Sequence, residues 1–144
     1  MTLAVVRVDG RRPYPPRISA FTQTFWSGLA EGRFLGTRCG ACAKASFPPK
    51  PFCPHCWSDR IEWFALAPHG TVYSSTVMHA VPAYFRHEAP YRVGIVDLDD
   101  GIRIATRVLG VEEGFGVGAR AEIVVLAYED GPLFAARIDG SERR

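Results

Sequence analysis

The chain has 144 residues, of which 47% are hydrophobic and 22% charged, and its formal net charge is +2. This length suits one domain or two very small ones, and this composition can bury a core, which excludes a disordered tail. The apolar runs are too short, and too often broken by Gly and Pro, to cross a bilayer. The N-terminal apolar stretch ends at Arg7, so we expect no secretory signal and a cytoplasmic protein. In that compartment the four cysteines are better suited to binding metal than to forming disulfides.

Charge is divided unevenly along the chain. Residues 1–38 carry six Arg against two acids, whereas residues 70–144 carry eight Arg against eleven acids. Neither segment has the dense cationic surface that nucleic-acid binding requires. We therefore expect no nucleic-acid partner, and we expect no membrane partner either.

The first part of the chain predicts an extended arm followed by a short helix. Residues 1–18 are rich in Arg and Pro, which favours an extended conformation. In residues 19–32 apolar side chains recur at spacings of three and four, as on one face of a helix, and Ser19 is suited to cap its start. That face includes Phe25 and Trp26. It either packs on the body of the protein or docks on a partner, and the residues leave both interpretations open.

The four cysteines form two pairs with the spacing of metal ligands. Cys39-Gly-Ala-Cys42 is followed, after ten residues, by Cys53-Pro-His-Cys56. Two residues between cysteines allow a tight knuckle that directs both sulfurs at one ion, and two knuckles complete a tetrahedral site. Residues 33–68 therefore predict a zinc ribbon with one structural zinc per chain. Iron in a rubredoxin-like site and a thioredoxin-like redox pair are the alternatives, but the short spacing and the missing βαβ context favour zinc.

Residues 69–139 predict a small all-β domain, with residues 140–144 as a tail. Five segments rich in β-branched and aromatic residues are separated by turn residues such as Asp99-Asp100-Gly101. The segments cover residues 70–79, 91–98, 102–109, 118–127 and 133–138. Five strands in about 70 residues fit a closed barrel of the OB type.

The connection after the first barrel strand carries aromatic and charged side chains that are suited to binding. Four successive residues form this cluster: Tyr84, Phe85, Arg86 and His87. Loops on a rigid barrel often bind ligands, although an ordinary anchored loop is the alternative. Arg103 and Arg107 lie four residues apart in one strand, an even step that places both on the same face. A solvated charge is the alternative for each arginine.

No catalytic pair stands out in the sequence. The cysteines are assigned to metal, the serines lack a nucleophile elbow, and the histidines at positions 55, 69, 79 and 87 are scattered. Closed coordination by four thiolates leaves zinc no open position for water. We therefore expect no catalysis by this chain alone.

The order of these features resembles that of a known family. The aromatic helix, the cysteine spacing, the Phe47-Pro48-Pro49 between the knuckles and the strand series that follows are similar to the rubredoxin-like zinc-ribbon plus OB-fold family associated with acyl-CoA metabolism. The resemblance covers residues 19–138. It implies a mainly β fold, with an N-terminal helix, a rubredoxin-like zinc ribbon and a five-stranded OB-fold barrel. Proteins of this family are small partner subunits of thiolases, thiolase-like aldolases, hydroxymethylglutaryl-CoA synthase and related acyltransferases.

The resemblance implies a non-catalytic accessory subunit that binds acyl-CoA and completes or bridges a thiolase-fold enzyme, in lipid, steroid or polyketide metabolism. The candidate contacts to ligand or partner are Phe25, Trp26, Tyr84, Phe85, Arg86, His87, Arg103 and Arg107. Two other functions stay open. One is a single-stranded nucleic-acid-binding OB-fold protein, against which the acidic barrel segment argues. The other is a free-standing enzyme acting on CoA esters, which needs a catalytic pair.

Overall fold

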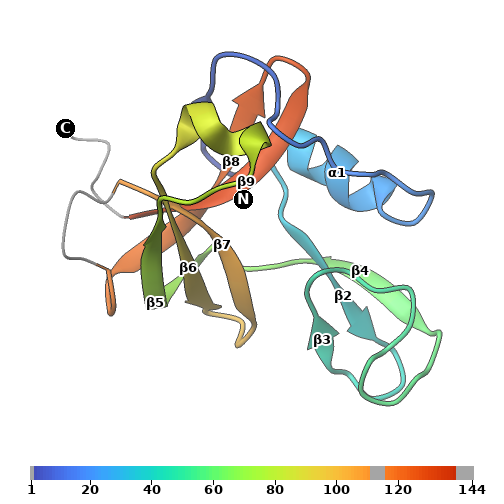
Figure 1. Ribbon diagram of the computed structural model, residues 1–144. Coiled ribbons are helices and arrows are strands. Elements are labelled where there is room, and N and C mark those ends of the chain that lie inside the picture. The colour runs from blue at the N-terminus through green and yellow to red at the C-terminus, as the bar shows by residue number, and fades with distance from the viewer. Residues whose placement is uncertain (1, 111–115, 139–144) are drawn as a thin grey trace.

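The computed structural model describes residues 2–110 and 116–138, so the predicted tail 140–144 lies outside the described residues. Figure 1 shows two β modules, a ribbon of short strands and a barrel of longer ones, with a helix beside them. The elements in chain order are β1 (Val5–Arg7), α1 (Gln23–Ala30), β2 (Leu35–Cys39), β3 (Ala45–Ser46), β4 (Ile61–Ala65), β5 (His69–Met78), the 3-10 helix η1 (Ala83–Glu88), β6 (Tyr91–Leu98), β7 (Arg103–Leu109), β8 (Arg120–Tyr128) and β9 (Gly131–Ile138). The mainly β fold expected from the sequence is confirmed.

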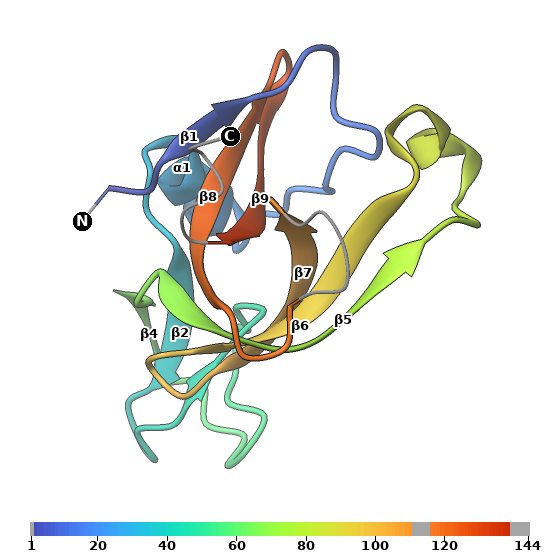
Figure 2. The same ribbon diagram turned by 90° about the vertical axis from the view of Figure 1, so that its left-hand side faces the viewer.

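Strands β5 to β9 close into a five-stranded barrel. β6 pairs antiparallel with β5 and β7, β9 pairs antiparallel with β8, and β8 pairs antiparallel with β5. A short parallel pairing between β7 and β9 completes the ring, which Figure 2 shows nearly end on. The register against β6 shifts between Val72 and Ser74, and the extra residue, Tyr73, is left exposed on the surface.

Alternation along the strands divides inward-facing from outward-facing side chains. On β6 and β7 the side chains of Val96, Ile104 and Val108 are buried in the barrel. Their neighbours Ile95 and Ala105, which are directly opposite each other in the register, face outward. The outer face of β5, β6 and β7 therefore carries small and apolar side chains that are not part of the barrel core.

Four phenylalanine rings join the helix and the ribbon to the barrel. They are Phe25 of α1, Phe34 just before β2, Phe47 just after β3 and Phe134 of β9. All six pairs of ring centroids lie 5.0 to 6.1 Å apart. Such pairs each contribute about 0.5–1.5 kcal/mol beyond the burial of their area. The two modules thus share a core rather than sitting on a flexible link.

Helix α1 is shorter than the stretch of residues 19–32 predicted from the sequence. The backbone N–H of Thr22 donates to the Ser19 hydroxyl at 3.1 Å, and the N–H of Ser19 donates to the Thr22 hydroxyl at 2.8 Å. This reciprocal turn occupies the residues ahead of the helix, which begins at Gln23. Phe25 and Leu29 are buried, so this part of the helix face packs on the body of the protein.

The N-terminal arm is anchored to the hairpin between β8 and β9. Strand β1 pairs parallel with β8, and farther along the arm Arg12 donates to the backbone carbonyls of Asp130 and Pro132 at 2.9 and 3.3 Å. The backbone N–H of Arg12 also donates to the Asp130 carboxyl and lowers its pKa. Gly131 has a φ of +148°, and a Cβ there would lie 2.6 Å from the guanidinium carbon of Arg12. The hairpin therefore needs glycine at this position.

The phenylalanine cluster predicts a large penalty for truncating its most deeply buried ring. Phe34 is only 2% exposed, and Phe34→Ala is expected to lower the free energy of unfolding by about 3–5 kcal/mol, measured by urea denaturation. The matched control is Phe52→Ala, since Phe52 is 40% exposed and its ring stacks on Trp57 at the surface of the ribbon. An equal loss of stability in the two variants would contradict the role given to the cluster.

Candidate metal centre and groove

The two knuckles bring the four cysteine sulfurs together. The Sγ atoms of Cys39, Cys42, Cys53 and Cys56 all lie within 4.8 Å of one another, and none forms a disulfide. The Sγ atoms of Cys39 and Cys56 are 3.6 Å apart, as are those of Cys42 and Cys53. Tetrahedral coordination with Zn–S bonds of about 2.3 Å places sulfurs about 3.8 Å apart. The four side chains therefore fit one zinc ion.

Both knuckles close with the same backbone turn. The N–H of Ala43 donates to the carbonyl of Cys39 at 2.9 Å, and the N–H of Trp57 donates to that of Cys53 at 2.8 Å. Ala43 and Trp57 both have positive φ angles, +69° and +66°. A side chain in this left-handed region costs about 1–2 kcal/mol. The turn that directs the sulfurs at one point therefore holds both residues in a backbone conformation that their side chains disfavour.

Backbone N–H groups and the neighbouring thiols set the charge of the centre. The N–H groups of Cys42 and Ala41 donate to the Sγ atom of Cys39 at 3.3 and 3.2 Å, and the pKa of Cys39 falls to about 6. At Cys56 the N–H of Ser58 lowers the pKa, but the adjacent thiols outweigh it and raise the pKa to about 12. Four thiolates this close need a cation, which agrees with a metal site. With four sulfur ligands the ion would have no open position, so its role would be structural.

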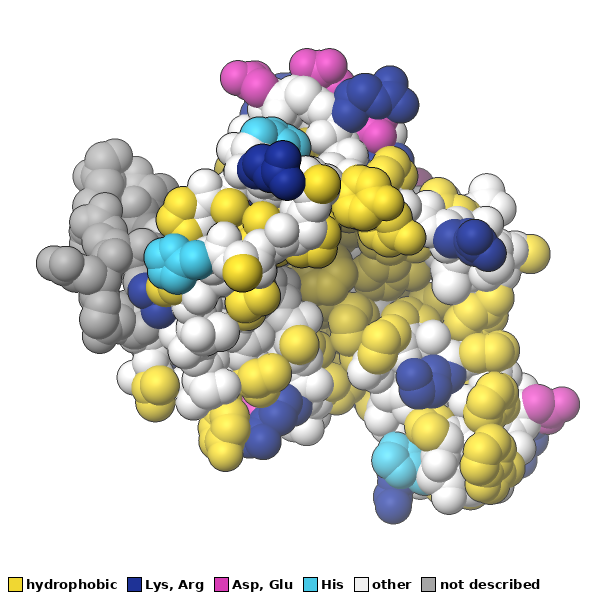
Figure 3. Space-filling model, in the orientation of Figure 1, with side chains coloured by type: hydrophobic (Ala, Val, Ile, Leu, Met, Phe, Trp, Pro, Cys, Tyr) yellow, Lys and Arg dark blue, Asp and Glu magenta, His cyan; other side chains and the backbone are white. Residues whose placement is uncertain are grey.

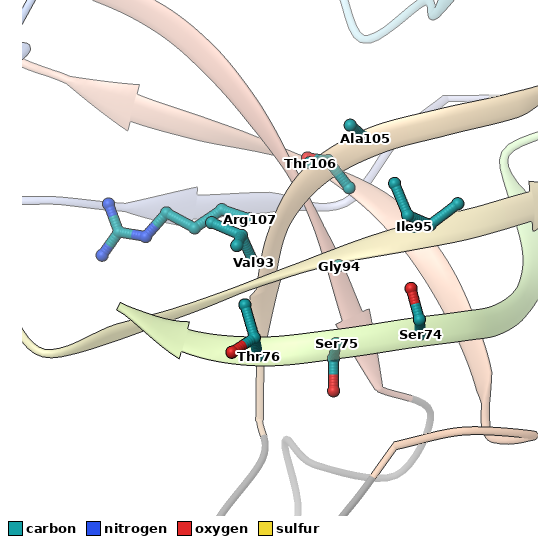
Figure 4. Close-up of a pocket in the computed structure, with 9 residues that line it drawn as sticks. All are labelled: Ser74, Ser75, Thr76, Val93, Gly94, Ile95, Ala105, Thr106 and Arg107. Atoms are coloured by element: carbon teal, nitrogen blue, oxygen red, sulfur yellow. The ribbon is translucent and has the colours of Figure 1, made fainter. Parts of the chain in front are cut away.

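A groove lies between the two modules, on the outer face of the barrel. One hollow of about 470 Å³ lies over β5, β6 and β7, as Figure 4 shows, and its lining is Ser74, Ser75, Thr76, Val93, Gly94, Ile95, Ala105, Thr106 and Arg107. A second hollow of about 360 Å³ is lined by Pro16, Arg17, Thr22, Phe25, Trp26, Phe47, Pro48, Pro49, Ala105 and Phe134. Ala105 lines both hollows, so they adjoin, and we call the pair the groove. Figure 3 shows hydrophobic side chains in the recess between the modules.

The sequence candidates on α1 and β7 have different positions relative to this groove. Phe25 is buried in the core, and it lines the second hollow together with Trp26. Arg107 lines the first hollow. Arg103 instead donates to Asp97 at 2.6 Å, which lowers the pKa of that carboxyl, and it stacks over the ring of Tyr73. Arg103 lines neither hollow.

The four candidates in the connection between β5 and β6 all lie in η1. The rings of Tyr84 and Tyr14 meet at 5.2 Å, and those of Phe85 and Tyr91 meet at 5.8 Å. Neither these two aromatics nor Arg86 and His87 line the two hollows of the groove. The structure thus places this cluster beside the groove and against the arm, rather than inside the groove.

Two features were missed by sequence reasoning. The first is Glu88, which pairs with Arg107. Its only signal in the sequence is that it is the single acidic residue of its loop. The second is a pair of exposed rings at the second knuckle, Phe52 and Trp57, stacked at 5.3 Å with an interplanar angle of 12°. Trp57 is 73% exposed. We call these two rings the ribbon plate; the signal was a tryptophan at the turn position after the last cysteine.

Comparison with known families covers most of the chain. Residues 26–62 match the family described as "ChsH2, rubredoxin-like zinc ribbon domain", and residues 63–126 match "ChsH2, C-terminal OB-fold domain". The two matches adjoin at the boundary between the ribbon and the barrel. No helix among the described residues is both long and apolar enough to span a membrane.

Curated relatives include a scaffold protein and enzyme subunits. A DUF35 domain-containing scaffold protein of Methanocaldococcus jannaschii is 33% identical over 67% of this chain and 71% of its own length. The benzoylsuccinyl-CoA thiolase subunit BbsA of Thauera aromatica is 29% identical over 80% of this chain and 81% of its own. A probable enoyl-CoA hydratase alpha subunit of Thermomonospora curvata is 40% identical over 60% of this chain, but this chain spans only 27% of that relative.

Among solved structures, a chain of the "Ltp2-ChsH2(DUF35) aldolase" superposes with a TM-score of 0.74. It is 30% identical in sequence, and the match covers 86% of this chain and 98% of that chain. The likeness therefore extends over both modules and not over the barrel or the ribbon alone.

The geometry of the metal centre predicts about one zinc per chain by metal analysis. Cys39→Ser is expected to lose the zinc and to unfold the ribbon, because site formation and folding are coupled in so small a module. Ala41→Ser is the control, since it adds a hydroxyl within the same knuckle but removes no ligand. Iron in place of zinc, or no metal in gently purified protein, would disprove the prediction.

Proposed function

We propose an accessory role in acyl-CoA metabolism for this chain, which belongs to the DUF35 family of proteins with a ChsH2-type zinc ribbon and OB-fold domain. In this proposal the chain is a non-catalytic subunit that binds a thiolase-fold enzyme and holds an acyl-CoA ligand beside it. The observation that carries the proposal is the match, over both modules, to a chain of an aldolase complex. The relative named as a thiolase subunit supports the same role.

The pairing of the charged side chains supports a non-catalytic role. On the barrel surface Asp97 is engaged by Arg103 and Asp99 by Arg120, at 2.6 and 2.8 Å. Both carboxyls have lowered pKa values because their arginine partners hydrogen-bond to them, so they are poor proton donors near neutral pH. The cysteines are the strongest nucleophiles of the chain, and a bound zinc would occupy all four.

The groove supports the acyl-CoA part of the proposal. The rings of Phe25, Phe47 and Phe134 form an apolar wall in the second hollow, which suits an acyl chain or a pantetheine arm. The first hollow adds hydroxyl groups, and Arg107 lies at its edge with the guanidinium extending away from the other lining residues, as Figure 4 shows. A guanidinium matches phosphate oxygens in shape and charge, so the two hollows together offer the mixed chemistry of a CoA ester.

The ribbon plate supports contact with a protein partner. Trp57 is 73% exposed, and the knuckle turn fixes its backbone so that the indole is presented at the surface of the ribbon. Tryptophan is enriched among the residues that contribute most to protein interfaces. The stacked ring of Phe52 holds the indole in place and limits the entropy that it would lose on binding.

The partner role predicts a specific effect of Trp57→Gly. Glycine accepts the positive φ without strain, so the variant is expected to be as stable as the native chain or about 1 kcal/mol more stable. It is nevertheless expected to bind a thiolase-fold enzyme of the same organism at least about tenfold more weakly, as loss of an interface tryptophan does. Binding is measured by calorimetry, after gel filtration of the co-expressed pair.

The control for this experiment is Tyr73→Ala, which removes another exposed aromatic ring, from the barrel instead of the ribbon. It is expected to leave the affinity unchanged. Unchanged affinity in Trp57→Gly would overturn the role of the ribbon plate. Elution of the native chain apart from the thiolase-fold enzyme would overturn the accessory role itself.

A further inference from the structure

Arg107, which lines the first hollow of the groove, is paired with a carboxylate that the chain itself supplies. Glu88, the last residue of η1, forms a short ion pair through Oε1 with a terminal nitrogen of Arg107. Its Oε2 accepts a hydrogen bond from the hydroxyl of Tyr128 at 3.0 Å. The Glu88 side chain is only 10% exposed and that of Arg107 is 23% exposed. The pair is therefore largely withdrawn from solvent, where an ionised carboxylate needs its partners.

Arg107 is only partly used by this contact. It lines the first hollow and also a smaller one of about 240 Å³, which contains Glu88, Leu109 and Tyr128. Its Nε is buried and has no hydrogen-bond partner among the described residues. A guanidinium binds carboxylates and phosphates best through two parallel hydrogen bonds. Glu88 engages one terminal nitrogen, the ring of Tyr91 lies 4.6 Å from the guanidinium carbon, and Nε is left without a hydrogen bond among the described residues.

The segment that carries Glu88 is otherwise weakly held. None of the residues of η1 is buried, and its ring contacts are to Tyr14 and Tyr91, which belong to the arm and to β6. Tyr14 and Tyr84 are both more than half exposed. A segment with few buried contacts opens at low cost, so the Glu88 carboxylate can leave while the barrel strands stay in place.

We propose that Arg107 is an anion-binding site at the outer end of the groove, and that Glu88 is its built-in occupant, which a phosphate group of a bound ligand replaces. The inference rests on the proposed function and deepens it, since it assigns the phosphorylated part of the CoA ester to one named end of the groove. The exchange replaces one charge pair by another, so the arginine is never left uncompensated. A phosphate also has oxygens enough to satisfy Nε and the terminal nitrogen together.

Tyr128 fits the same exchange. Burial, together with the hydrogen bond to Glu88, raises its pKa to about 12, so its hydroxyl keeps its proton at neutral pH. The hydroxyl donates to the Glu88 carboxylate now and can donate to a phosphate oxygen in its place. The site therefore holds two donors of fixed position, one charged and one neutral, for whichever anion is present.

Calorimetric titration of the full chain with coenzyme A and with pantetheine, which lacks the phosphates, tests the proposal. Glu88→Gln keeps the shape and removes the competing charge, but its amide has one acceptor oxygen in place of the two that Arg107 and Tyr128 use. It is expected to tighten coenzyme A binding about tenfold, or about 1.4 kcal/mol, and to leave pantetheine binding unchanged. Arg107→Gln is expected to weaken coenzyme A binding to the level of pantetheine binding. Arg107→Lys keeps the positive charge but removes the guanidinium, and it is expected to weaken coenzyme A binding as well.

The matched control is Glu31→Gln, which changes the net charge equally. Glu31 pairs with Arg33 in an exposed contact at the end of α1, and it lines neither hollow. A second readout is hydrogen exchange of residues 83–88, which is expected to quicken when coenzyme A binds. If Glu88 had only a structural role, hydrogen exchange of residues 83–88 would slow down or stay unchanged when coenzyme A binds. Equal coenzyme A affinities in the native chain and in Glu88→Gln would overturn the inference.

Pyrophosphate separates this inference from the proposed function. If neither coenzyme A nor pantetheine binds, the acyl-CoA role fails, and the anion site is then judged by pyrophosphate alone. Binding of pyrophosphate to Glu88→Gln, and its loss in the double variant with Arg107→Gln, would support the site. No binding of pyrophosphate to Glu88→Gln would overturn it.

Discussion

The packing of four phenylalanine rings determines how the two modules of this chain are placed. The rings come from the helix, from both sides of the ribbon and from the last barrel strand, and each is within 6.1 Å of the other three. Protein interiors are packed as tightly as organic crystals, so the cluster allows few other arrangements. Phe25, Phe47 and Phe134 also line the second hollow. The contacts that stabilise the fold therefore shape the groove as well.

A metal centre frees the ribbon from the need for a large core of its own. Modules this small bury too little apolar surface to fold on hydrophobic burial alone. In the ribbon, Cys39 and Cys53 are among the most deeply buried side chains, whereas Phe52 and Trp57 lie at the surface. Coordination would hold the knuckles together from within. Aromatic side chains that would otherwise have to pack in the core of the ribbon can then lie on its surface.

The sequence was sufficient to predict those features of the fold that depend on local patterns. Alternation and turn residues gave the barrel strands, and cysteine spacing gave the cluster of sulfurs, because each depends on neighbours within one turn or one strand. Long-range pairing decided the rest. Arg103 and Arg107 share a face, but Asp97 lies opposite Arg103 in the register, so only Arg107 is left to line the groove. Its partner Glu88 comes from an irregular segment whose path no periodicity describes.

The wall that the ribbon contributes to the second hollow lies between the two knuckles. Phe47, Pro48 and Pro49 follow Cys42 and precede Cys53, so an ion shared by the four sulfurs would tie together both ends of the segment that contains them. Without the ion, the stretch becomes part of a longer free loop with more conformations to lose. Metal affinity and the affinity for any occupant of this hollow are therefore thermodynamically coupled. Because such coupling is reciprocal, filling the hollow also strengthens the hold on the metal.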